Sequence, residues 1–194
     1  MVAQTKPATL EDLTATPDDG RIYELLNGEI IVSAAPTFRH QLVLQVLYQS
    51  LYGWTQEHDG GIAMIAPTDV VLNDANALQP DLFVLMDDNR GEIVNGKFNG
   101  VPDLAVEIIS PTSRSRDATV KAMRYALAGV REFWLADPDL RTLNIFILAD
   151  GVYAEVSPGP DRALHSVVLA GLRVDPAAVF EQVEQSINRR TRKA

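Results

Sequence analysis

The sequence predicts an α/β (α+β) fold with a mixed central β-sheet flanked by helices, and three observations lead to it. Apolar stretches at 103–110 and 131–136 have the composition of buried strands, and a helix-like stretch at 117–128 lies between them. A strand, a helix and a strand over this length form a βαβ unit, so the two strands should be parallel with a right-handed crossover. Two more strand-like stretches, 141–148 and 151–157, are joined by a short turn and should run antiparallel, which makes the sheet mixed.

The composition indicates one domain spanning residues 1–194. Hydrophobic residues make up 46% of the chain and charged residues 22%, which is ordinary for a soluble globular protein. The chain contains no cysteine, so disulfides and thiolate metal sites are excluded. No apolar run reaches the roughly 18 residues of a membrane helix, and the first residues lack the pattern of a signal peptide. We therefore expect a cytoplasmic protein with no membrane partner.

The N-terminal part of the chain predicts a short helix, a hairpin and a long helix. Residues 5–18 read as a loop and a short helix capped by Thr9. Residues 21–33 form two apolar arms around Asn27-Gly28, the pair favoured in a type I′ hairpin turn. Residues 38–58 carry apolar side chains at helical spacing, which predicts an amphipathic helix.

The remaining elements lie between and after these segments. Two strands are expected at 66–73 and 80–86, joined by the turn-rich stretch 74–79. Residues 92–100 read as a loop or lid-like excursion, and residues 175–188 predict a closing helix.

Several charged side chains fall where the pattern directs them inward. Glu107 lies in the middle of an apolar strand, and Asp81 opens another. A buried carboxylate is costly unless it is neutralised or coordinates a cation. On the helix that follows Glu107, Lys121 and Tyr125 lie one turn apart on the same face. We therefore expect two carboxylates, an ammonium and a phenol to meet on one side of the sheet.

Two interpretations of this cluster stand side by side. In the first, Asp81 and Glu107, with the backbone carbonyl of Ile108, hold Mg²⁺ or Mn²⁺, which prefer oxygen ligands. Lys121 would then orient or help deprotonate an attacking water, or stabilise the transition state of phosphoryl transfer. In the second, Glu107 and Lys121 form a structural ion pair and Asp81 caps the end of its strand.

The run "PDLAVEIISPTSRSRDATVKAMRYALAGVREFWLADP", residues 102–138, resembles the signature of the Uma2 family (domain of unknown function 820). The blocks "YELLNGEIIVS", "PTFRHQ", "QPDLFVL" and "GLRVDPAAVF" resemble that family too, in the same order, from about residue 10 to 182. Uma2 belongs to the PD-(D/E)XK superfamily. The resemblance implies a restriction-endonuclease-like sheet with an N-terminal β-hairpin, a core at about 10–182, and a basic tail at 186–194.

The resemblance also implies roles for particular residues. Asp81 matches the acid of the "PD" element, and Glu107 matches the acid of the (D/E)XK element. Two positions after Glu107, where that element carries lysine, the chain has Ile109, and Lys121 on the following helix fits the migrated lysine. Glu24 matches an acidic position that is implied to complete the metal site.

Three accessory candidates remain open. His40 matches a family histidine and would contact a phosphate or the surroundings of the metal, or else hydrogen-bond to the backbone at its helix start. Tyr125 matches a family tyrosine, for which packing and orientation are favoured over catalysis. Ser110 and the arginine-bearing loop that follows would hold phosphate, or else form a solvated turn.

The function implied by the resemblance is a Mg²⁺- or Mn²⁺-dependent endonuclease acting on DNA. Dimers are common in that superfamily and would suit cutting two strands. The net charge of −9 argues against a protein that coats nucleic acid by bulk electrostatics. The alternatives are a non-catalytic module of the same fold that binds nucleic acid or protein, and a metal-dependent hydrolase of a smaller phosphoester.

Overall fold

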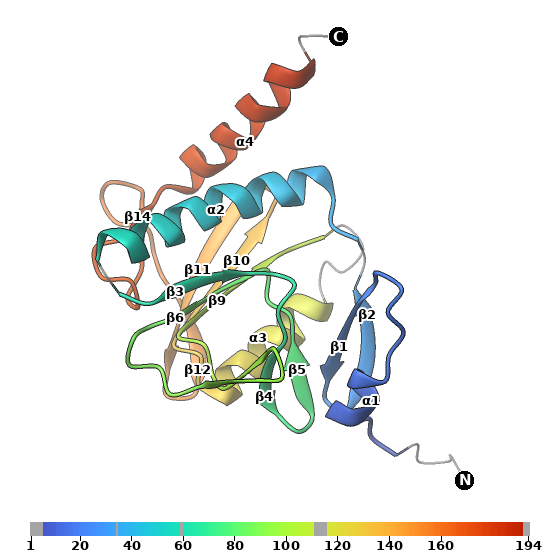
Figure 1. Ribbon diagram of the computed structural model, residues 1–194. Coiled ribbons are helices and arrows are strands. Elements are labelled where there is room, and N and C mark those ends of the chain that lie inside the picture. Colours follow the sequence, from blue (N-terminus) through green and yellow to red (C-terminus); the bar gives the residue numbers. More distant parts are fainter. Residues whose placement is uncertain (1–5, 34, 59, 111–115, 192–194) are drawn as a thin grey trace.

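The computed structural model describes residues 6–33, 35–58, 60–110 and 116–191. A six-stranded mixed sheet lies at its centre (Figure 1). The strands of this central sheet are, in spatial order, β12 (Val152–Glu155), β11 (Thr142–Ala149), β10 (Glu132–Asp137), β9 (Leu104–Ile108), β6 (Leu82–Leu85) and β3 (Ile62–Ile65).

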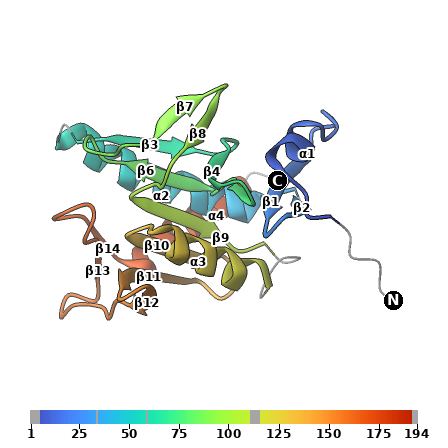
Figure 2. The ribbon, with the colours of Figure 1, turned by 90° about the horizontal axis from the view of Figure 1, so that it is seen from below.

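Helices cover both faces of the central sheet, as Figures 1 and 2 show. The long helix α2 (Phe38–Glu57) lies on one face, and the C-terminal helix α4 (Pro176–Thr191) packs against α2 and projects beyond it. Helix α3 (Arg116–Ala128) lies on the opposite face. No helix in the described ranges is long and apolar enough to cross a membrane.

A second six-stranded sheet stands beside the first and includes the N-terminal hairpin. Its spatial order is β2 (Glu29–Ser33), β1 (Ile22–Leu26), β5 (Asn76–Leu78), β4 (Val70–Asn73), β8 (Lys97–Asn99) and β7 (Glu92–Val94). A small two-stranded sheet pairs β13 (Leu164–His165) with β14 (Arg173–Val174). The expected mixed sheet with flanking helices is thus confirmed, and the second sheet is an addition to it.

The βαβ unit is present as expected. Strands β9 and β10 are parallel, with Glu107 opposite Leu135, and α3 forms the crossover between them. Gly129 ends α3 with φ of 95°, a left-handed conformation that glycine adopts without steric cost, and its N–H donates to the Tyr125 carbonyl. The short crossover therefore returns the chain directly into the central sheet.

Alternation along β9 divides its side chains between two environments. Leu104, Val106 and Ile108 belong to the core under α2, whereas Ala105 belongs to a cluster beneath α3. Glu107 faces the α3 side as well, because successive side chains of a strand point to opposite faces. A single strand thus contributes apolar residues to the main core and a carboxylate to the other side.

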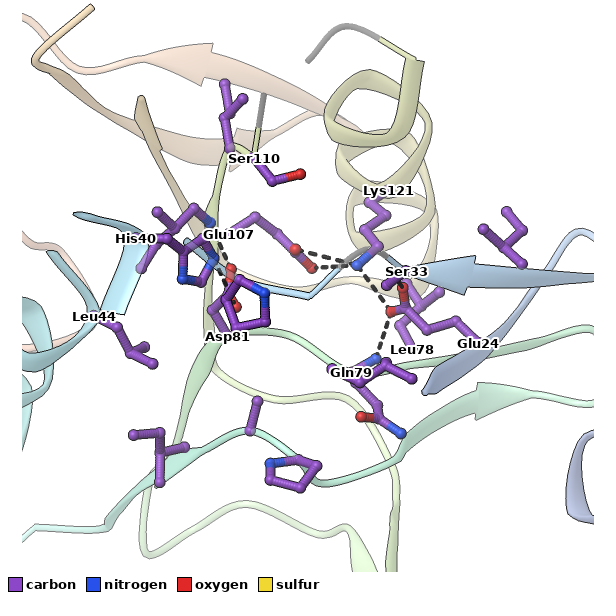
Figure 3. Close-up of a pocket in the computed structure, with 18 of the residues that line it drawn as sticks. Glu24, Ser33, His40, Leu44, Leu78, Gln79, Asp81, Glu107, Ser110 and Lys121 are labelled. Atoms are coloured by element: carbon purple, nitrogen blue, oxygen red, sulfur yellow. Dashed lines mark hydrogen bonds and ion pairs between the residues drawn. The ribbon is translucent and has the colours of Figure 1, made fainter. Parts of the chain in front are cut away.

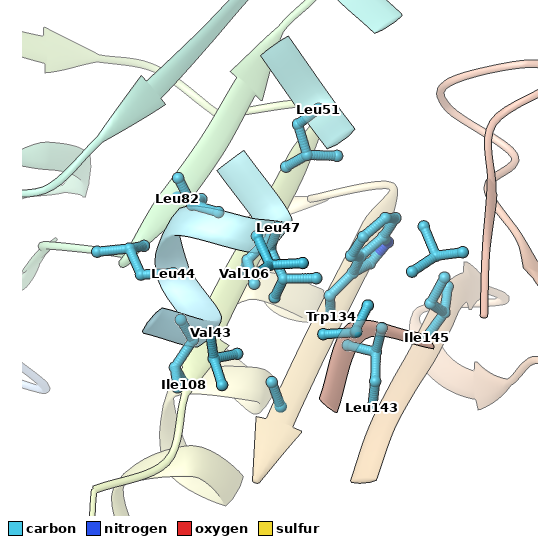
Figure 4. Packing of buried hydrophobic residues seen from close by; sticks show 14 of the residues in the cluster. Val43, Leu44, Leu47, Leu51, Leu82, Val106, Ile108, Trp134, Leu143 and Ile145 are labelled. Atoms are coloured by element: carbon cyan, nitrogen blue, oxygen red, sulfur yellow. The ribbon is translucent and has the colours of Figure 1, made fainter. Parts of the chain in front are cut away.

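The main core lies between α2 and the central sheet (Figure 4). Val43, Leu47 and Leu51, spaced by four residues along α2, are completely buried. They pack against Val106 and Trp134 of the neighbouring strands β9 and β10. Full burial of side chains of this size stabilises a fold by about 1.5–3 kcal/mol each, so this layer anchors the start of α2 beside the strand ends.

The N-terminal elements agree with the sequence. Thr9 caps α1 (Leu10–Thr14) in a capping box, in which its hydroxyl accepts from the Asp12 N–H and the Asp12 carboxylate accepts from the Thr9 N–H. Asn27 and Gly28 have φ of 56° and 72°, the positive values that a type I′ turn requires. The hairpin of β1 and β2 follows from this turn.

Other predictions for the middle of the chain were wrong. Residues 92–100 are not a lid-like loop but the hairpin of β7 and β8, turned by Asn95-Gly96, with β8 parallel to β4. Within the stretch expected to be a turn, residues 76–78 form strand β5, and only Asp74 and Ala75 make the turn. Strand β3 was not expected. These strands are short, and long-range pairing rather than their own alternation defines them.

Glu132 is a buried carboxylate outside the sequence-based cluster, and hydrogen bonds hold it in place. Its Oε1 accepts from Trp134 Nε1 at 2.6 Å, and its Oε2 accepts from the N–H groups of Val167 and Val168 at 2.7 and 2.9 Å. Glu132 is fully buried, so these three donors replace water around the carboxylate. Glu132 thereby ties the segment before β14 to β10.

We predict that Glu132→Ala lowers the free energy of unfolding by roughly 3 kcal/mol or more, since each buried donor left without an acceptor costs about 1–3 kcal/mol. Glu132→Gln should cost less, because one acceptor oxygen remains. Urea unfolding measures both, with Glu29→Ala at an exposed position of β2 as the control. If Glu132→Ala were as stable as the control, the hydrogen bonds of Glu132 would not stabilise the fold.

Candidate active site

Lys121 joins the two large sheets through two buried ion pairs (Figure 3). Its Nζ, presented by α3, lies 2.8 Å from Oε1 of Glu24 on β1 and 3.1 Å from Oε2 of Glu107 on β9. Tyr125, one turn further along α3, donates its hydroxyl hydrogen to Oε1 of Glu107 at 2.7 Å. One helix therefore supplies both groups that hold Glu107.

Asp81 has a separate set of partners. Its Oδ2 accepts from the Ile108 N–H at 2.7 Å, at the end of β9, and its Oδ1 lies 3.3 Å from Nε2 of His40. His40 lies in the first turn of α2, and its backbone N–H donates to the Thr37 capping hydroxyl. The two partners come from different elements and contact different oxygens, so together they fix the orientation of the Asp81 carboxylate.

These groups line one cavity of about 540 Å³. The polar and charged residues of its wall are Glu24, Ser33, His40, Gln41, Gln79, Asp81, Glu107, Ser110 and Lys121. Asp81 and Glu107 thus open into the same space, which is the first condition for sharing a cation. Ile108 and Ile109 lie on the wall next to them.

A further set of residues supports Glu24. Its Oε2 accepts from the Ser33 hydroxyl at 2.9 Å, and its Oε1 accepts from the backbone N–H of Gln79 at 2.7 Å. The Gln79 side chain in turn donates to Asp69 at 2.7 Å, and Lys97 of β8 pairs with Asp69 at 2.9 Å. Sequence reasoning missed this support, because the partners are far apart in the chain. The one local sign of a role for Gln79 is its position directly before Pro80-Asp81, which places it next to the site.

Acidic side chains outnumber lysines among the described residues of the cluster. Three carboxylates, Glu24, Asp81 and Glu107, share the cavity with one ammonium, that of Lys121, and with the imidazole of His40 beside Asp81. Burial raises the pKa of Glu107 to about 7; Lys121 opposes this, and the nearby charges of Asp81 and Glu24 add to it. The pKa of Lys121 is raised because the attraction of Glu107 and Glu24 exceeds the opposing effect of burial. Lys121 therefore keeps its proton beside these carboxylates.

The structure brings together most of the residues named from the sequence. Glu24, His40, Asp81, Glu107, Ile108, Ser110 and Lys121 all line the cavity, and Tyr125 reaches Glu107 from α3. The His40 side chain pairs with Asp81 rather than with the backbone, which corrects one alternative for it. The loop after Ser110, the expected phosphate holder, lies outside the described residues at 111–115.

The site differs in two ways from one in which all the acidic side chains surround a single metal ion. Lys121 pairs with Glu24 and Glu107, whereas Asp81 takes His40 as its partner. Within the described ranges, no group of three or more histidine or acidic side chains is arranged to hold a metal ion. Lys121 thus occupies part of the coordination space of both Glu24 and Glu107, whereas Asp81 has no contact with it.

We predict that Lys121→Met destabilises the fold by about 3–5 kcal/mol, because it leaves two buried carboxylates without their counter-charge. Adding Glu24→Gln to this variant should recover part of the loss, since one of the stranded charges is then removed. Urea unfolding of the single and double variants tests this.

The control is Arg173→Met, which removes an exposed ion pair with Asp161 and should change the stability little. If Lys121→Met were as stable as this control, Lys121 would not be the counter-charge of the site.

Comparisons with known proteins bear on the fold and the family. Among solved structures, a protein from Anabaena variabilis ATCC 29413, described as a "putative nuclease belonging to DUF820", superposes with a TM-score of 0.76 at 20% identity, over 91% of this chain and 99% of that chain. At this identity the similarity concerns the fold, and it confirms the expected architecture. No curated protein matches the chain.

The family model "Uma2: Putative restriction endonuclease" matches residues 8–177. Since this match spans most of the chain, the protein belongs to the Uma2 family.

Proposed function

We propose that this protein is a Mg²⁺- or Mn²⁺-dependent endonuclease that hydrolyses DNA phosphodiester bonds, with residues 1–194 forming one nuclease domain. The observation that carries the proposal is that the carboxylates of Glu24, Asp81 and Glu107 open into one cavity in which, among the described residues, Lys121 is the one ammonium. Carboxylates gathered in this way are costly in a protein interior. A divalent cation would offset that cost, and family membership supports the nuclease assignment.

The donor set suits a hard divalent cation. Mg²⁺ is typically bound through one or two carboxylates, with waters and substrate phosphate oxygens as its other ligands. Asp81 and Glu107 would supply the carboxylates, and the backbone carbonyl of Ile108 would supply a further oxygen. Each carboxylate keeps lone pairs for this purpose, because an ionised carboxylate offers about four acceptor sites and the contacts described above use only some of them.

The bound ion would lower the pKa of a coordinated water and neutralise charge that develops on the phosphate. Lys121 would act through its charge. Its raised pKa keeps the ammonium protonated, which favours stabilising a negatively charged transition state over removing a proton from water. Glu24 would hold that ammonium beside Glu107, as the 2.8 Å contact supports. Tyr125 would keep Glu107 oriented.

The alternative of a structural ion pair explains only part of the site. It accounts for Lys121 and Glu107, and the hydrogen bond from the Ile108 N–H fits Asp81 as a strand-end cap. It does not account for Asp81 and Glu107 opening into the same cavity. A non-catalytic module accounts for Lys121, Glu24 and Glu107 as structural ion pairs, but it likewise gives no reason for a third carboxylate, that of Asp81, in the same cavity.

We predict that the protein cleaves DNA in Mg²⁺ or Mn²⁺ and that EDTA abolishes the activity. A supercoiled plasmid and a single-stranded circular DNA serve as substrates, and gel electrophoresis separates nicked from linear plasmid. Linear product at early times would support paired copies acting on both strands. Glu107→Gln should lower the rate by at least about 10²–10³-fold, the typical cost of losing one electrostatic group at a transition state.

The matched control is Glu92→Gln, at an exposed position of β7, which should retain full activity. Circular dichroism confirms that both variants are folded. Cleavage that persists in EDTA, or a Glu107→Gln variant as active as the control, would contradict the proposed function.

A further inference from the structure

The proposed reactive groups lie inside the cavity rather than on an open surface. The side chains of Glu107 and Lys121 are each 11% exposed, that of Asp81 is 19% exposed and that of Glu24 is 2% exposed. A phosphate that reacts here must therefore enter the cavity. Its sugar and base must then be accommodated by the walls around it.

These walls are largely apolar. The β1–β2 hairpin supplies Ile22, Leu26 and Ile31, and the opposite side supplies Leu44 from α2 and Ile65 from β3. Ile22 and Ile65, both partly open to solvent, carry the apolar surface outward from the buried carboxylates. Such a surface suits the flat face of a base and the carbon face of a sugar, but not a row of phosphates.

The size of the cavity points in the same direction. A volume of about 540 Å³ falls within the range in which proteins hold one small molecule, about 300–1,000 Å³. A B-form duplex, whose major groove alone is about 12 Å wide, would have to present its phosphate from outside with its bases still stacked. A single unstacked nucleotide could enter entirely.

We propose that the substrate is an unpaired nucleic-acid strand, one nucleotide of which enters this cavity. This inference rests on the proposed function. The base and sugar lie against the apolar wall formed by Ile22, Leu26 and Ile31, and the phosphate reaches Asp81 and Glu107. An unpaired strand offers such a nucleotide at little cost, whereas a duplex must first lose pairing and stacking.

The charge of the protein supports this assignment. A net charge of −9 gives little long-range attraction for a polyanion. Binding must therefore draw on contacts other than those to a row of phosphates. Burial of one base and sugar in the apolar cavity supplies such contacts, and only an unstacked nucleotide can make them.

The test compares one labelled oligonucleotide in three forms: unpaired, fully paired, and paired with an unpaired 3′ overhang. With Mn²⁺ present, the unpaired form should be cut at least roughly tenfold faster than the duplex, since unpairing costs a few kcal/mol. Cuts in the third form should fall in the overhang or at its junction. Bis(p-nitrophenyl) phosphate, a small phosphodiester, is assayed in parallel to report on the chemistry alone.

A wall variant tests the cavity itself. Ile65→Ser should raise KM for the unpaired strand about fivefold, because it removes apolar contact at the mouth of the cavity. Ile93→Ser, at an exposed position of β7 that does not line the cavity, is the matched control and should leave this KM unaltered.

The outcomes separate this inference from the proposed function. Duplex cut as fast as the unpaired form would overturn the inference and leave the endonuclease intact. Hydrolysis of the small phosphodiester alone would overturn it in favour of a small phosphoester substrate. No metal-dependent hydrolysis of any substrate would overturn both.

Discussion

The ion pairs of Lys121 with Glu24 and Glu107 are the contacts on which the rest of the site depends. Glu24 belongs to the sheet of the N-terminal hairpin, Glu107 belongs to the central sheet, and Lys121 comes from the helix on the other side of Glu107. The contacts therefore hold the hairpin against the central sheet. The same hairpin forms one wall of the cavity, so the stability of the fold and the shape of the site have a common origin.

The lysine reaches this position by an unusual route that the strand geometry explains. A lysine two residues after Glu107 would share its face of the strand, because side chains alternate along a strand. Ile109 occupies that position and lies on the cavity wall. Helix α3 instead delivers Lys121 to Glu107 from above the same face.

Much of this arrangement follows from local patterns, and the remainder depends on contacts distant in the sequence. The mid-strand position of Glu107, the crossover through α3 and the Asn27-Gly28 turn all carry local signals. Asn95-Gly96 carries the same turn signal, but the arms around it are only three residues long, too short for a clear alternation, so the hairpin of β7 and β8 was missed. Sequence-based reasoning offered the pair of Glu107 with Lys121, which is present, but it did not give the partners of Glu24 and Asp81. The pairing of Lys121 with Glu24, and of Asp81 with His40, depends on how the two sheets and α2 meet.

The central claim is that the carboxylates of Asp81 and Glu107 together hold a divalent cation. Anomalous diffraction from crystals grown with Mn²⁺ tests it most directly. The account predicts an anomalous peak in the cavity about 2.0–2.6 Å from oxygens of both carboxylates, with Lys121 still paired to Glu24. A cavity with no such peak at saturating Mn²⁺, or a peak bound elsewhere on the surface, would contradict it.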